Sequence, residues 1–206
     1  MGGVIDDAVK IAFYNHVHIE GNGKREPRWR GTRVVKFPTD LILYAQTIFD
    51  LKPDFIIETG TRFGGASQFF GDMLTLGGGS GRVISIDVKD WGAPAHPKVE
   101  YVIGSSADRA VVAETAAKVA GAKVMVVLDS DHRRVHVQRE LRLWSHVVTV
   151  GQFLVVEDCY TRNVEPYWPG QAVEWFLRRA KNFQRQAVED QFLFAVSRGG
   201  WLKRLA

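Results

Sequence analysis

The chain has 206 residues, of which 46% are hydrophobic, and it carries a formal net charge of +4. This length and composition allow one sizeable core, so we expect a single domain, and no uninterrupted apolar stretch reaches the length of a membrane span. One cysteine, Cys159, excludes an internal disulfide framework and a cysteine-only metal site, and the scattered basic residues predict no nucleic-acid partner.

The first 35 residues have no clean long period, because glycine and proline interrupt them repeatedly. They predict an N-terminal arm or lid, with a merely packed extension as the alternative, before a single domain over residues 36–206. The arm has no secretory pattern, so we expect a cytoplasmic protein that does not bind membranes. A helix is expected from Pro38-Thr39-Asp40, with Thr39 as its N-cap, and Pro53 ends it.

Residues 55–65 are the most informative stretch of the chain. An apolar run ends in Glu58, a glycine-rich turn follows, and apolar residues then recur at helical spacing. This pattern predicts a buried strand, a tight loop and an amphipathic helix. Such a loop brings backbone N–H groups to the carboxyl end of a strand, where open α/β sheets bind nucleotide-like ligands.

Further strands alternate with helices along the rest of the chain. Three short apolar runs, over 83–87, 124–128 and 153–156, end at or directly before acids. A weaker strand is expected over 99–103, and helices are expected before Gly121, over about 133–147 and after Pro169-Gly170. The tail suggests closing strands over 192–196 and 201–205, which we expect to be antiparallel. This alternation predicts an α/β fold with a doubly wound, mostly parallel sheet.

The loop after the first strand matches the dinucleotide pattern G-x-G-x-x-G only in part. It resembles instead the first motif of class I S-adenosylmethionine-dependent methyltransferases, E/D-x-G-x-x-x-G. The resemblance implies a Rossmann-like fold in which Gly60 approaches the cofactor and Asp87 accepts hydrogen bonds from the ribose hydroxyls. Ser105, with Ser106, also fits the N-cap of the next helix. The residues implied in cofactor binding are Glu58, Gly60, Thr61, Arg62, Gly64, Ser67, Asp87, Ser105 and Asp129.

Three acids follow the last two parallel strands: Asp129 after one, and Glu157 and Asp158 after the next. Because neighbouring parallel strands end at the same crevice, we expect the three to converge. Their mutual repulsion requires protonation or a bound cation, and oxygen ligands favour magnesium, manganese or calcium. A zinc site of Asp129, His132 and His136 is the competing interpretation, but it leaves Glu157 and Asp158 without a role.

The order of these residues is similar to that in metal-dependent O-methyltransferases of the catechol type. That resemblance implies that Asp129, Glu157 and Asp158 hold magnesium and that the residue three positions after Asp129 accepts a proton. This residue is His132, where the catechol group commonly has lysine. The metal would lower the pKa of a substrate hydroxyl and aim its oxygen at the cofactor's methyl group. A second interpretation makes His132 a helix-cap residue or a partner of Asp129.

A closer resemblance, to the cephalosporin hydroxylase-like family, covers nearly the whole chain. Six stretches carry it: Trp29-Arg30-Gly31, 36–41, 56–60, 128–132, 154–158 and 169–173. That family has a methyltransferase fold with S-adenosylmethionine and magnesium sites, and it includes enzymes that tailor antibiotics and rhamnosyl groups. The resemblance implies an O-methyltransferase acting on a hydroxyl of a natural product, phenol or sugar, with Asp129 and His132 in catalytic roles. We also expect a homo-oligomer.

Two other functions remain as alternatives. A hydroxylation-associated tailoring protein would keep the fold, but no obvious two-histidine-one-carboxylate site accompanies the acids. A catalytically inactive cofactor-binding subunit is disfavoured because Asp129, Glu157 and Asp158 are intact. Tyr160, Tyr167 and Trp168 are expected on a loop above the crevice, either as an aromatic wall for the acceptor or as packed residues.

Overall fold

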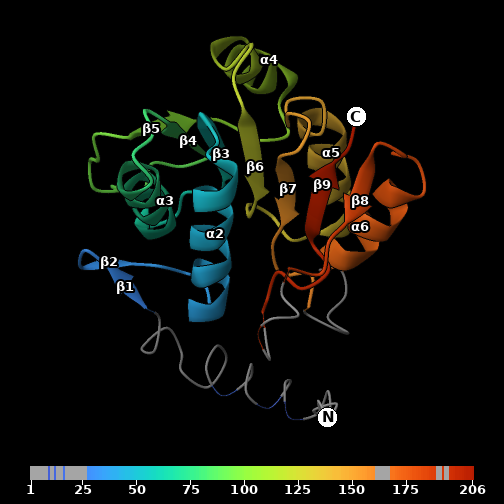
Figure 1. Cartoon of the computed structure of the whole chain (residues 1–206), viewed down its shortest axis with the longest axis horizontal. Helices are drawn as coiled ribbons and strands as arrows, with labels where there is room; N and C mark the ends of the chain where they lie inside the picture. Colours follow the sequence, from blue (N-terminus) through green and yellow to red (C-terminus); the bar gives the residue numbers. More distant parts are fainter. Residues whose placement is uncertain are drawn as a thin grey trace.

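The computed structural model describes residues 27–160, 168–188 and 195–206, together with Phe192 and the isolated positions 9, 12 and 16. Its centre is a seven-stranded sheet in the order β5-β4-β3-β6-β7-β9-β8 (Figure 1). The strands are β3 (Phe55–Thr59), β4 (Arg82–Asp87), β5 (Val99–Ile103), β6 (Val124–Leu128), β7 (Phe153–Val156), β8 (Phe183–Arg185) and β9 (Trp201–Arg204). The helices are α2 (Pro38–Leu51), α3 (Gly65–Leu76), α4 (Arg109–Lys118), α5 (Arg134–Trp144) and α6 (Pro169–Leu177).

The first five strands of the order are parallel, and β9 pairs antiparallel with both β7 and β8. The predicted doubly wound α/β fold with antiparallel C-terminal strands is therefore confirmed. The strand expected over 201–205 is β9. Val196, from the strand expected over 192–196, lies in a turn instead, and β8 forms earlier in the chain. No helix among the described residues is long and apolar enough to cross a membrane.

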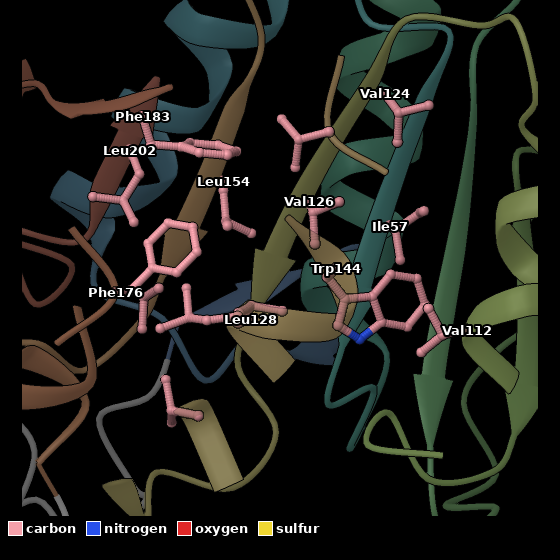
Figure 2. Close-up of a cluster of buried hydrophobic side chains, with 14 of the residues drawn as sticks. Ile57, Val112, Val124, Val126, Leu128, Trp144, Leu154, Phe176, Phe183 and Leu202 are labelled. Carbon is pink, nitrogen blue, oxygen red and sulfur yellow. The ribbon is translucent and has the colours of Figure 1, made fainter. Parts of the chain in front are cut away.

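Helices cover both faces of the sheet, which explains why its central strands are apolar on both sides. On one face, α2 and α3 pack against the sheet around Tyr44 and Phe70. On the other face lie α4, α5 and α6, and Figure 2 shows Trp144 of α5 beside Ile57 and Val112. Trp144 is fully buried, and its indole N–H donates to the Ser106 carbonyl at 2.9 Å. The two cores fix the strand ends that carry the polar residues.

Two helix starts differ from the predicted ones. Helix α2 begins at Pro38 and its N-cap is Phe37, because proline fits the first helical position without losing a hydrogen bond. Thr39 therefore lies inside the helix. Helix α4 is capped by Asp108, whose carboxylate accepts the Ala110 N–H at 2.8 Å, and Ser105 and Ser106 lie in the loop before it.

A small hairpin precedes α2 and packs on α3. It consists of β1 (Arg28–Trp29) and β2 (Thr32–Arg33). Trp29 meets Phe69 edge to face with centroids 5.0 Å apart, and its indole N–H donates to Asp72 at 2.8 Å. Val34 is completely buried. Residues 27–35 are thus a packed part of the fold, whereas the rest of the expected arm or lid lies almost wholly outside the described residues.

Strand order reverses between β3 and β6, because β4 continues the sheet on one side of β3 and β6 begins the other side (Figure 1). Ligand sites of open α/β sheets lie at such a switch point, at the carboxyl ends of the strands. In register, Thr59 pairs with both Ile86 and Leu128, and Leu128 pairs with Val156. The residues that follow these positions are therefore brought to one edge of the sheet.

Candidate active site

The loop after β3 is tied to both neighbouring strands. The Gly60 N–H donates to the Ile86 carbonyl at 2.8 Å, and the Asp129 N–H donates to the Thr59 carbonyl at 3.0 Å. Gly60 has a φ of 92°, and a Cβ built on it would lie 2.1 Å from the Asp129 carbonyl oxygen. Only glycine fits there, because both the conformation and the space exclude a side chain. The loop therefore touches the end of β6 directly.

Glu58 supports this loop from inside the protein. Its side chain is fully buried and accepts hydrogen bonds from the hydroxyls of Ser67 and Ser85, the latter at 2.7 Å. Burial raises the pKa of Glu58 above its ordinary value. Glu58 and Ser67 were both predicted to bind the cofactor, but this network joins them to the strands beneath the loop.

Asp87 stands at the end of β4 with its carboxylate held by backbone donors. Its two oxygens accept the N–H groups of Arg62 at 3.0 Å and Lys89 at 3.1 Å. The side chain is thus oriented by the loop after β3 and by its own loop. Each carboxylate oxygen can accept a further hydrogen bond, so Asp87 remains able to bind a ligand hydroxyl.

A cavity of about 660 Å³ opens along this edge of the sheet. The stretch from the end of β2 to the start of α2 contributes Arg33, Val35, Lys36 and Phe37. The loop after β4 contributes Val88 and Trp91. Gly64, Ser105 and the buried pair Glu58 and Ser67 do not line it. The predicted site residues that line it are Gly60, Thr61, Arg62, Asp87, Asp129, His132, Glu157 and Asp158. The predicted cofactor end and the predicted acidic end therefore share one cavity.

Asp129, His132 and Asp158 form the group of potential metal ligands among the described residues. One ligand atom from each lies within 4.8 Å of the others. The His132 Nε2 is 3.4 Å from Asp158 Oδ2 and 4.0 Å from Asp129 Oδ1. Burial lowers the pKa of His132, but the carboxylates of Asp158 and Asp129 outweigh it, so that the pKa is raised overall. Burial raises the pKa of Asp129 to about 7.

Glu157 is not a member of this group, although it directly precedes Asp158 and lines the same cavity. Its carboxylate accepts hydrogen bonds from Lys36 Nζ at 2.9 Å and from the Tyr44 hydroxyl. Asp158 has a φ of 56°, a left-handed conformation that is uncommon for residues with a side chain. This conformation lets the two consecutive acids contact different partners. Asp129 connects them, because its Oδ2 is 2.8 Å from the same Lys36 Nζ.

Lys36 is the charged residue between the acids, and sequence reasoning did not assign it to the site. Its side chain is 2% exposed, and its ammonium bridges Asp129 and Glu157. The available signal was a lysine placed directly before the Phe-Pro that starts α2. Since its partners lie 93 and 121 residues further along the chain, no local pattern reports the contact.

The competing zinc interpretation is not supported by the position of His136. The His136 Nε2 lies 3.2 Å from the Ser130 hydroxyl and 3.7 Å from Glu140 Oε1, in a separate polar group. The expected aromatic wall is divided. Tyr160 is buried against Phe37 and Val196, Trp168 lines a different cavity next to α5 and α6, and Tyr167 lies outside the described residues.

Comparison with known proteins gives a consistent result. The family model described as rhamnosyl O-methyltransferase/CmcI matches residues 24–205. A rhamnosyl O-methyltransferase of Mycobacterium leprae is 30% identical over 189 residues, which cover 85% of this chain and 82% of that protein. That of Mycobacterium tuberculosis H37Rv is 32% identical over 149 residues, which cover 69% of this chain and 60% of that protein.

Solved structures share the fold at lower sequence identity. CmcI bound to Mg and SAM has a TM-score of 0.67 at 20% identity, covering 87% of this chain and 77% of that one. A putative caffeoyl-CoA O-methyltransferase from Staphylococcus aureus has a TM-score of 0.61 at 14% identity, covering 87% and 91%. MycE bound to Mg and SAH has a TM-score of 0.51 at 20% identity, covering 62% and 33%.

Proposed function

The chain belongs to the rhamnosyl O-methyltransferase/CmcI family, and from this premise we propose that it is a magnesium-assisted, S-adenosylmethionine-dependent O-methyltransferase. Its acceptor is a hydroxyl of a small molecule, with a sugar moiety as the first class to test. One observation carries the proposal: a single cavity joins Gly60 and Asp87 at one end to Asp129, His132 and Asp158 at the other. Methyl transfer needs this adjacency, because cofactor and acceptor oxygen must meet.

The cofactor end fits S-adenosylmethionine in its chemistry. The bare backbone of Gly60 lets a ligand approach closely, and Asp87 offers carboxylate oxygens already oriented by two N–H donors. We assign cofactor contacts to the lining residues Gly60, Thr61, Arg62, Asp87 and Asp129. Three other predicted residues act by shaping the loop after β3. Gly64 is the left-handed N-cap of α3, and the buried side chains of Glu58 and Ser67 are hydrogen-bonded to each other.

The acidic end fits a hard divalent cation. Asp129 and Asp158 offer carboxylate oxygens, which suit magnesium and also manganese or calcium. Glu157 borders the same end of the cavity, and we retain it as the third acidic ligand of the proposal. A bound cation would lower the pKa of an acceptor hydroxyl, and the cofactor would supply the methyl group.

His132 is the proposed proton acceptor. Its imidazole is about one third exposed, lines the cavity and stands between Asp129 and Asp158. The carboxylates beside it stabilise the imidazolium that forms when it accepts the hydroxyl proton. Lys36 does not suit this role, because its surroundings hold it protonated.

The setting of the enzyme is also proposed. We expect a cytoplasmic homo-oligomer in the biosynthesis of a natural product. Support for the oligomer comes from Ile42 and Phe49 on α2, which are 49% and 43% exposed. Light scattering of the purified protein tests this part independently of catalysis.

The central experiment measures binding and transfer separately. Calorimetry with S-adenosylmethionine, with and without magnesium, reports cofactor binding. A panel of rhamnosides, other glycosides and phenols is then screened by mass spectrometry for the gain of one methyl group. We expect cofactor binding and magnesium-dependent methylation of a hydroxylated acceptor. Cofactor binding without transfer to any acceptor would favour the inactive-subunit alternative, and full transfer in excess chelator would refute the metal role.

A further inference from the structure

Lys36 is a buried cation among acids, and methyl transfer as proposed gives it no task. Its Nζ lies 2.8 Å from Asp129 Oδ2 and 2.9 Å from Glu157 Oε1, and its side chain is 2% exposed. The amine also stands 5.4 Å from the centre of the Tyr44 ring. Burial opposes its charge, but the carboxylates of Asp129 and Glu157 outweigh burial and raise the pKa of Lys36. The ammonium therefore forms charge-assisted hydrogen bonds with two carboxylates at once.

Stability alone does not explain why Lys36 is buried between Asp129 and Glu157. Burying charges costs desolvation energy, and replacing a buried ion pair by apolar residues often leaves a protein as stable as before. Here one ammonium serves two acids, and a second buried donor, the Tyr44 hydroxyl, is committed to Glu157. Lys36 and Tyr44 therefore hold the carboxylates of Asp129 and Glu157 in place, and Lys36 also reduces the negative charge at the acidic end of the cavity.

Charge counting gives the arrangement a purpose. Asp129, Glu157 and Asp158 contribute three negative charges when ionised, and Lys36 removes one of them. The remaining charge of minus two matches a divalent cation. The ammonium of Lys36 repels a trivalent cation more strongly than a divalent one. Removal of Lys36 should therefore favour the cation of higher charge.

We propose that Lys36 is the built-in counter-ion of the acidic site, which sets its net charge to minus two and selects divalent over trivalent cations. The inference rests on the proposed function, since it assumes that Asp129, Glu157 and Asp158 hold a metal. Lys36 is then a positioning and selectivity residue that acts through Asp129 and Glu157.

The test compares ion affinities, so it needs no acceptor and no methyl transfer. Calorimetry with MgCl₂ and TbCl₃ gives the ratio of Tb³⁺ to Mg²⁺ affinity for the wild type, Lys36→Met and Lys36→Arg. We expect Lys36→Met to raise this ratio at least tenfold and Lys36→Arg to change it less than threefold. Lys123→Met is the matched control, because it removes one exposed positive charge before the opposite end of β6 and should leave the ratio unchanged.

Circular dichroism establishes that each variant is folded. If Lys36→Met does not fold, Lys36→Gln removes the charge while keeping a hydrogen-bond donor, and the same tenfold rise is expected. A ratio unchanged in the neutral variant, or raised equally in Lys36→Arg, overturns the role of Lys36 while leaving the metal site intact. Absence of any Mg²⁺ binding by the wild type would instead overturn the metal part of the proposed function.

Discussion

The imidazole of His132 faces the carboxylate of Asp158, with Nε2 3.4 Å from Oδ2, although the two residues follow different strands. His132 lies in the loop after β6, and Asp158 comes after Glu157, the residue that directly follows β7. The parallel pairing of these strands creates the contact. The contact places a titratable base at the acidic end of the cavity.

Replacement of His132 by asparagine should lower kcat by about 10²- to 10⁴-fold, the usual contribution of a general base. Cofactor affinity should stay within a few-fold. His132 must be neutral to accept the hydroxyl proton, so wild-type turnover should rise with pH as His132 loses its own proton. This limb should disappear in the variant.

His136→Asn is the matched control for that measurement. His136 lies in the first turn of α5, four residues after His132, and contacts Ser130 and Glu140 instead. Its variant should keep the wild-type pH profile. An unchanged profile in His132→Asn would contradict the assignment of the base.

Replacement of Asp158 by asparagine should abolish measurable turnover and weaken magnesium binding at least tenfold, because it removes one charged oxygen ligand. The affinity for S-adenosylmethionine should remain nearly unchanged, since the cofactor end is formed by Gly60 and Asp87. Calorimetry with each ligand separates the two effects. Equal loss of both affinities would indicate general disruption of the cavity.

Asp87→Asn should weaken S-adenosylmethionine binding by at least about tenfold, because hydrogen bonds to charged groups contribute about 1.5–3 kcal/mol. Asp90→Asn is the control: this exposed acid lies on the same loop and bonds the Gly92 N–H at 2.8 Å. Magnesium affinity should not change in either variant. Cofactor binding as strong as wild type in Asp87→Asn would remove Asp87 from the site.

Gly60→Ala should reduce the free energy of unfolding by about 2–4 kcal/mol, because the new Cβ meets the Asp129 carbonyl and the positive φ adds strain. Gly92→Ala is a matched comparison, since Gly92 also has a positive φ, of 69°, but nothing lies within 4 Å of the added Cβ. It should cost only about 1–2 kcal/mol. Urea denaturation measures both, and equal losses would mean that the contact with Asp129 is unimportant.

Asp40 predicts a pH dependence of stability. Its buried carboxylate accepts the N–H groups of Val196 and Ser197 at 3.0 Å, and burial raises its pKa from 3.8 to about 6. Because the folded state binds this proton more tightly than the unfolded state, the contribution is greatest below pH 3.8 and is lost as pH rises through 6. The loss should be about 2–3 kcal/mol.

The comparison with Asp40→Asn isolates this contribution. The difference in unfolding free energy between wild type and variant, measured in urea from pH 4 to 7, should shift against the wild type as pH rises. Asp50→Asn, an exposed position on the same helix, should keep the wild-type slope. A pH-independent difference for Asp40→Asn would show that the residue does not titrate in this range.

Sequence reasoning predicted the strands and the acids at their ends because both depend on local patterns. Apolar runs ending in Asp87, Asp129 and Glu157 determine β4, β6 and β7, and parallel pairing then brings their ends together. The parallel part of the sheet and the position of these acids at one edge of it follow from these two facts.

What sequence reasoning could not predict depends on distant contacts. The direction of Glu157 is set by Lys36 and Tyr44, which precede it by more than one hundred residues. Glu58 lies in the motif and Ser67 lies shortly after it, so both could be assigned to the cofactor, but the hydrogen bonds that hold them involve Ser85 in the next strand. The predicted helix starts were wrong by a few residues, because Pro38 and Asp108 can begin a helix as readily as Thr39, Ser105 and Ser106.

Lys36 follows within a few residues of the hairpin of β1 and β2, which packs on α3. Trp29 is anchored on Phe69 and Asp72, Val34 enters the core, and Lys36 follows. Shortened forms of the protein that begin after residue 35 would lose the anchor of that lysine along with one side of the cavity. In these shortened forms, the preference for divalent over trivalent cations should be lost while the sheet still folds. A deletion series should therefore remove the residues before 27 and residues 27–35 in separate steps.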